Sequence, residues 1–201
     1  MAAKKKGKKS APKSKKKAVK KAVKKAVKKA VKKAVAAVAA PNPWKAYGDW
    51  FAQEAATTLK VLRAYPAEQG GFQTHPRSGT AMQLCWTFTI EQGIVVEAIK
   101  GTLKMPPNFP PAPPTFADGV AAFEKKVGEV KAAIAAAKPA DWGRLHNFFT
   151  GPGQMGMVPT GAICHLMLCD QIHHRGQLSV SVRMAGGKVP SIYGPSGDEP
   201  W

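Results

Sequence analysis

The stretch Asp170-Gln171-Ile172-His173-His174-Arg175-Gly176-Gln177-Leu178 is the part of this sequence that decides the fold. Asp170 and His174 stand four residues apart, so in a helix their side chains project from one face about one turn apart. That spacing suits two ligands of one metal ion, and it also suits a hydrogen-bonded pair of a carboxylate and an imidazole. We therefore expect a helix here with a cluster of ionisable groups.

Outward from this stretch, the sequence predicts four long helices. Apolar residues recur every three to four positions from Trp44 to Ala64 and from Thr115 to Ala137, while Thr80 to Lys100 is mostly apolar. The helix around the quoted stretch should extend from Thr160 to Ala185, where Gly186-Gly187 ends it. Four helices that each have an apolar face predict an all-α protein, an up-down-type four-helix bundle.

The connections between these helices also have clear sequence signals. Ser78 is the expected cap of the second helix, after the turn at His75-Pro76. Six prolines between residues 105 and 114 exclude a helix and predict a stiff crossover loop. The Gly-rich segment from Asp141 to Pro159 is expected to be irregular, with room for a short hairpin. Pro41-Asn42-Pro43 separates a basic tail, residues 1–41, from the bundle, residues 42–201.

On these residues the chain resembles the DinB/YfiT family of four-helix-bundle proteins, over about residues 44–201. Members of that family typically hold a divalent metal, usually nickel or zinc, with three histidines. One histidine lies on the second helix, often directly after a Trp, and two form a His-x-x-x-His pair on the last helix. In this chain His174 matches the second member of that pair, Asp170 occupies the position of the first, and Thr87, after Trp86, occupies the third position.

The resemblance therefore implies a metal site that is altered or lost. Asp170 can bind zinc or manganese through oxygen, but the neutral hydroxyl of Thr87 is a weak ligand. Zinc, nickel and manganese are the candidate ions, and a hydrogen-bonded pair of Asp170 and His174 without metal is the alternative. The matching block and the C-terminal stretch of the family assign supporting roles near the site to His173, Arg175, Gln177 and Tyr193.

Other histidines and the cysteines give weaker signals. His165, Cys169 and His173 share one helical stripe, but at ~1.5 Å per residue they span about 12 Å and cannot all reach one ion. His75 and His146 lie in predicted loops and are expected to be exposed. Three cysteines without regular spacing indicate reduced thiols rather than a disulfide framework.

The first 40 residues contain 17 lysines and no acidic residue, which leaves +2 of the net charge of +19 for the remainder. The segment from Lys16 to Val35 repeats Lys-Lys-Ala-Val. Such a chain is expected to be disordered alone and more helical on a polyanion, because like charges oppose the free helix. It resembles the Lys-rich tails of linker histones. Its lysines should bind phosphates without reading sequence: Lys16, Lys17, Lys20, Lys21, Lys24, Lys25, Lys28, Lys29, Lys32 and Lys33.

Two functions remain open on the sequence alone. The chain is either a DinB-like bundle tethered to DNA or RNA by its tail, or a metal-dependent enzyme of the type that uses low-molecular-weight thiols, with Asp170 and His174 at the metal. A homodimer is compatible with both. No apolar run approaches the ~20 residues that span a bilayer, so we expect a cytoplasmic protein, with association to the nucleoid as an option.

Overall fold

The computed structural model of the chain describes residues 23–28 and 42–200, and the chain divides into two units, 1–41 and 42–201. Residues 23–28 are helical, in place of the disorder expected for them. Of the lysines assigned to the tail site, Lys24, Lys25 and Lys28 lie in this helical segment. The others lie outside the described residues: Lys16, Lys17, Lys20, Lys21, Lys29, Lys32 and Lys33.

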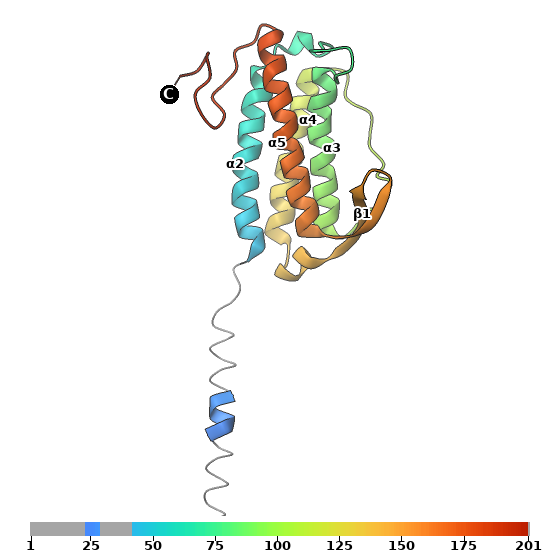
Figure 1. The fold of residues 1–201 in the computed structure, drawn as a ribbon, viewed down its shortest axis with the longest axis vertical. Helices are drawn as coiled ribbons and strands as arrows, with labels where there is room; N and C mark the ends of the chain where they lie inside the picture. Colours follow the sequence, from blue (N-terminus) through green and yellow to red (C-terminus); the bar gives the residue numbers. More distant parts are fainter. Residues whose placement is uncertain (1–22, 29–41, 201) are drawn as a thin grey trace, which may run out of the picture. The chain divides into compact units, whose positions relative to one another are not determined.

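The second unit is a four-helix bundle, which confirms the predicted all-α bundle (Figure 1). Its helices are α2 (Pro43–Ala64), α3 (Ala81–Lys100), α4 (Phe116–Ala136) and α5 (Thr160–Met184). Each boundary lies within one residue of the sequence-based expectation. Short 3₁₀ turns at Ala67–Gln69 and Pro139–Gly143 complete the helical structure.

Local capping explains why the helices begin and end where they do. The Asn42 side chain accepts a hydrogen bond from the backbone N–H of Trp44, with Pro43 in the first turn. The expected cap at Ser78 is wrong: Thr80 caps α3 and forms a reciprocal capping box with Gln83, which better satisfies the free N–H groups. α5 is followed by Gly186 at a φ of 86°, a left-handed value that favours glycine.

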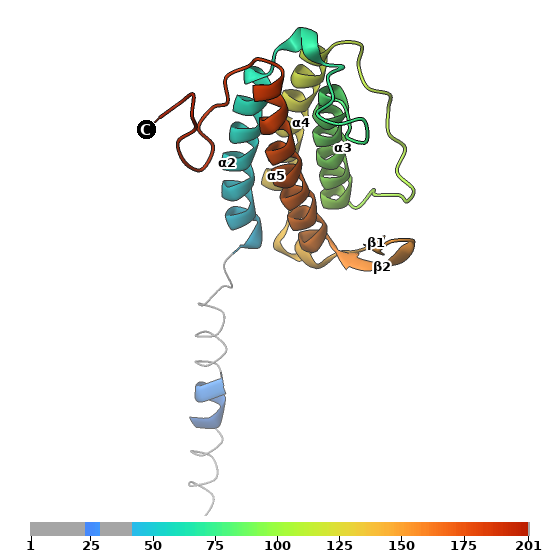
Figure 2. The ribbon, with the colours of Figure 1, turned by 45° about the horizontal axis from the view of Figure 1, so that its top comes forward.

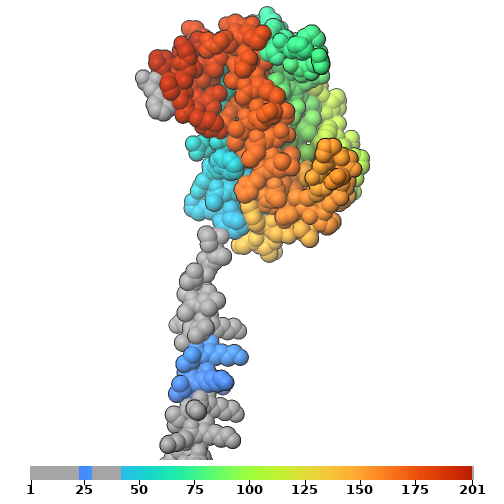
Figure 3. Space-filling view, viewed as in Figure 1, coloured from blue at the N-terminus to red at the C-terminus, as the bar shows by residue number. Residues whose placement is uncertain are grey.

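α2 runs parallel to α5, and α3 and α4 run parallel to each other in the opposite direction (Figure 1). The helices therefore do not alternate in direction along the chain, as the predicted up-down type would require. α3 packs against α4 and α5, and α2 packs against α4 and α5. The first turn of α4 lies against the first turn of α3: a Cβ added at Gly119 on α4 would meet the side chains of Met82 and Cys85 on α3. The Pro-rich connection therefore returns the chain along the full length of α3 (Figure 2). α5 crosses the bundle face between α2 and the hairpin (Figure 3).

The segment between α4 and α5 is more regular than the sequence predicted. β1 (Leu145–Gly151) and β2 (Gln154–Pro159) form an antiparallel hairpin with an irregularity between Phe149 and Gly151. It lies at the end of the bundle where α5 begins (Figure 2). Alternation places Phe148 in the core while Phe149 remains exposed.

The core runs through the centre of the bundle and holds the helices in place. Burial of such side chains supplies the main driving force for the fold, at ~25 cal/mol per Å² of apolar surface. The side chains with no exposed surface include Phe51, Ala55, Val61, Cys85, Phe88, Val95, Phe123, Val130, Ile163, Leu168 and Leu178. Within residues 23–28 and 42–200, no helix combines the length and apolar character that crossing a membrane requires.

Candidate metal site

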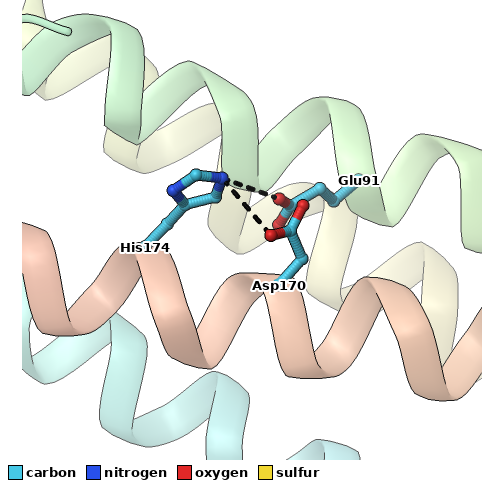
Figure 4. Close-up of side chains that lie close together, drawn as sticks. All are labelled: Glu91, Asp170 and His174. Atoms are coloured by element: carbon cyan, nitrogen blue, oxygen red, sulfur yellow. Dashed lines mark ion pairs between the residues drawn. The ribbon is translucent and has the colours of Figure 1, made fainter. Parts of the chain in front are cut away.

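Three ligand-type side chains meet between α3 and α5: Glu91, Asp170 and His174 (Figure 4). One ligand atom of each lies within 4.8 Å of the others. His174 Nε2 is 3.6 Å from Asp170 Oδ1 and 3.8 Å from Glu91 Oε1. The antiparallel packing of α3 on α5 supplies the third residue opposite the predicted Asp170–His174 pair.

Glu91 is a carboxylate in an unusual environment. Its side chain is 5% exposed, and neither carboxylate oxygen accepts a hydrogen bond from a donor among the described residues. The neighbouring Asp170 carboxylate can share a hydrogen bond with Glu91 only when one of the two groups is protonated. Burial, and next the negative charge of Asp170, raise the pKa of Glu91 to about 9. A buried carboxyl group without a hydrogen-bond donor is destabilising, unless a cation or a proton compensates its charge.

Gln177 fixes the orientation of the imidazole. Its side-chain oxygen lies 3.0 Å from His174 Nδ1, and its nitrogen lies 3.0 Å from His173 Nε2. When His174 Nδ1 carries the proton that Gln177 accepts, His174 Nε2 has a free lone pair directed at the two carboxylates. Gln177 thus contacts both His173 and His174, and the supporting role of His173 and Gln177 at a metal stays a prediction.

Thr87 lies one turn before Glu91 on α3, and its hydroxyl donates to the backbone carbonyl of Gln83 at 2.9 Å. Ligation by Thr87 stays a prediction. Sequence reasoning missed Glu91, although a signal was present. Glu91 is an acidic residue in a mostly apolar helix, four positions after Thr87 and therefore on the same face.

Arg175 and Tyr193 belong to a different polar network, which faces α2. The buried guanidinium of Arg175 pairs with Glu54 Oε2 at 2.7 Å and donates to the Tyr193 hydroxyl. Tyr193 in turn donates to Glu54 Oε2 at 2.7 Å. Gln171 donates to Thr58 on α2, which Arg175 also contacts. The network attaches the segment after α5 that contains Tyr193 to the bundle.

The remaining histidines and cysteines occupy mixed environments. His165, Cys169 and His173 are all exposed, and His75 is exposed as predicted. The predicted exposure of His146 is wrong: it lies on β1, is buried, and its Nε2 is 2.9 Å from the Thr160 hydroxyl. Burial lowers the pKa of His146 and raises the pKa of the two buried thiols, Cys85 and Cys164, to about 12.

The chain is similar to known proteins both in sequence and in fold. Residues 41–200 match the DinB family. The chain is 28% identical to the uncharacterized protein YrdA of Bacillus subtilis over 148 residues, which cover 73% of this chain and 85% of YrdA. A DinB-like protein from Bacillus cereus ATCC 10987 superposes with a TM-score of 0.60 at 23% identity, over 74% of this chain and 97% of that one. The DinB-like protein YjoA of B. subtilis gives 0.58 at 15% identity, over 77% and 95%.

Proposed function

The chain belongs to the DinB family, and we propose that it binds one divalent metal ion through Glu91, Asp170 and His174. The observation behind this proposal is the buried carboxylate of Glu91, which has no hydrogen-bond donor among the described residues and faces His174 Nε2. A cation between these groups would compensate the charge of Glu91.

The distances fit such an ion. Two atoms that each lie about 2.1 Å from a tetrahedral ion are about 3.4 Å apart. The separations of 3.6 and 3.8 Å from His174 Nε2 to the two carboxylates are close to this value. They are too long for hydrogen bonds, which would draw the groups together. The site therefore has the size of an ion-binding site without rearrangement of the helices.

The donor set also favours some ions over others. Two carboxylates and one imidazole suit manganese, iron(II) or zinc better than nickel, because carboxylate oxygens are hard ligands. The site is altered from the three histidines that the family resemblance implied, and it contains Glu91 in addition to the predicted Asp170 and His174.

Three protein ligands leave coordination positions open, as in catalytic rather than structural sites. The side chains of Asp170 and His174 are 43% and 23% exposed, so a small molecule can reach the ion. A bound ion would act as a Lewis acid and lower the pKa of a water or thiol that it binds. These features support the second candidate, a metal-dependent enzyme of the thiol-dependent transferase or isomerase type.

Metal analysis of the full-length, tag-free chain tests the proposal. After equilibration with manganese, zinc or nickel and removal of free ion, we expect near-stoichiometric metal in the wild type. Glu91→Gln and Asp170→Asn should lose it, whereas Glu97→Gln, an exposed acid on the same helix, should retain it. Equal metal content in the wild type and the Asp170→Asn variant would contradict the proposal. Thiol-transfer assays with metal then test the enzyme candidate.

We further propose that the tail tethers the bundle to nucleic acid without sequence preference. The support is the Lys-Lys-Ala-Val repeat, of which residues 23–28 form a helical segment with exposed Val23 and Val27. Binding should weaken as the salt concentration rises. A plot of the logarithm of the binding constant against the logarithm of the salt concentration should have a slope of roughly −0.9 for each phosphate contacted on duplex DNA. Fluorescence anisotropy with the full chain and with the repeat lysines changed to Gln measures this slope. Unchanged binding by the Gln variant would refute the tether.

A further inference from the structure

A small apolar cavity lies between α3 and the Pro-rich connection, which runs beside that helix in Figure 2. Its volume is about 140 Å³. The apolar wall consists of Trp86, Ile90, Ile94, Pro107, Phe109 and Pro110. A cavity of about 150 Å³ lined by apolar side chains holds one benzene ring. The size and the aromatic wall therefore match a single aromatic ring.

The outer wall of the cavity is held in place before any ligand arrives. The indole N–H of Trp86 on α3 donates to the backbone carbonyl of Pro110 at 3.1 Å. The prolines around it have fixed φ angles, so the connection has few alternative conformations. A preformed wall lowers the entropic cost of binding, because little of the protein has to be ordered.

Gly93 on α3 lines the cavity and keeps it open. A Cβ atom added at Gly93 would meet no atom within 4 Å. Glycine is unfavourable inside a helix compared with alanine, so neither helix propensity nor a close contact accounts for its presence here. The empty space above Gly93 is instead part of the cavity.

The polar residues of the lining define the polar end of a ligand. Glu97 and Asn108 are exposed and therefore lie at the mouth. Lys126 also lines the cavity, but its Nζ pairs with Glu129 at 2.6 Å. The Glu97 carboxylate has no ion pair or side-chain hydrogen bond within residues 42–200 or 23–28. A hydroxyl group at the mouth can therefore donate to Glu97, a charge-assisted hydrogen bond.

We propose that this cavity binds a single-ring aromatic alcohol of the phenol class, with the ring against Trp86 and Phe109 and the hydroxyl donating to Glu97. The site is separate from the Glu91–Asp170–His174 group, and its occupancy does not depend on metal. For a ligand of about seven heavy atoms we expect a Kd of about 0.1–1 mM.

Phenol is the probe, titrated into the full chain with chelator present and followed through the indole N–H resonance of Trp86 in ¹H–¹⁵N spectra. Gly93→Leu should weaken binding at least about tenfold by filling the cavity. The chain should still fold, because an added Cβ at Gly93 meets no atom within 4 Å and leucine favours the helix over glycine. Gly128→Leu is the matched control: it is an exposed helical glycine on α4 with nothing within 4 Å of an added Cβ, and it should bind phenol like the wild type.

Anisole, which lacks the O–H donor, should bind severalfold more weakly than phenol, and Glu97→Gln should reduce this preference. Saturable binding of phenol that Gly93→Leu removes and Gly128→Leu retains supports the site. No shift of the Trp86 resonance at tens of millimolar phenol would overturn it, as would undiminished binding in Gly93→Leu. Equal affinity for phenol and anisole would overturn the assigned role of Glu97.

Discussion

The substitution Glu91→Gln separates the proposed function of Glu91 from its effect on stability. In the metal-free chain, burial and Asp170 raise the pKa of Glu91 from 4.5 to about 9. Between these two values the folded chain holds a proton that the unfolded chain has lost, so stability falls as pH rises through this window. At ~1.36 kcal/mol per unit, the loss is about 3 kcal/mol at pH 7 and about 6 kcal/mol above pH 9.

Glutamine has the shape of the protonated carboxyl group but does not titrate. The free energy of unfolding of Glu91→Gln should therefore lack this pH dependence. Between about pH 5.5 and pH 8.5, the difference in stability between variant and wild type should change by about 4 kcal/mol in favour of the variant. The constant cost of burying an amide cancels in this comparison, because it is the same at each pH.

Urea denaturation at three pH values with chelator present measures both curves. Added manganese or zinc should stabilise the wild type, by about 2.7 kcal/mol at a concentration one hundred times the Kd, and should leave Glu91→Gln unchanged. Parallel pH curves for the two proteins would refute the reasoning, because Glu91 would then ionise in the folded chain as it does in water. If metal also stabilises the Glu91→Gln variant, Glu91 is not a ligand of the ion, while the reasoning about its pKa still holds.

Three further predictions concern the rest of the bundle. A thiol reagent near pH 8 should modify Cys169, which is exposed, and leave the two buried cysteines intact until the chain unfolds; mass spectrometry of peptides checks this. Arg175→Met should cost about 3–5 kcal/mol in urea denaturation because it leaves the buried Glu54 carboxylate without its positively charged partner, and adding Glu54→Gln should recover part of that loss. Gly161→Ala should lower stability by about 1–3 kcal/mol, since its Cβ would lie 2.2 Å from the Trp142 ring; an unchanged melting temperature would disprove this contact.

Much of the fold could be predicted from the sequence, because local chemistry determines it. The apolar spacing in α2 and α4 indicates helices with one buried face. Glycines with positive φ follow the ends of α3 and α5, at Gly101 and Gly186, and the prolines between residues 105 and 114 exclude a helix in the connection after α3. The spacing of four residues between Asp170 and His174 predicts that both lie on one side of α5, whichever helices pack against it. These features depend on backbone geometry within a few residues.

Other features depended on which segments pack together. The sequence predicted a cap at Ser78, but α3 begins after Thr80, where the backbone N–H groups of Ala81 and Met82 donate to carbonyls of Phe72 and Gly70 in the α2–α3 connection. Tyr193 was expected beside the metal site, whereas its hydroxyl contacts Glu54 and Arg175 on the side of α5 that faces α2. A rotation of about 100° per residue separates the directions of Arg175 and its neighbour His174.

The sequence by itself therefore determined the helices, their ends, the basic tail and two members of the candidate metal site. Only the tertiary structure decided the third member: Glu91 lies 79 residues before Asp170 in the chain, and the antiparallel packing of α3 on α5 brings them together. Its burial, its raised pKa and its lack of a hydrogen-bond donor all follow from that packing. Residue spacing predicts which side chains share one helix face. The pKa of a carboxyl group depends instead on its burial and on nearby charges, which the packing of other helices determines.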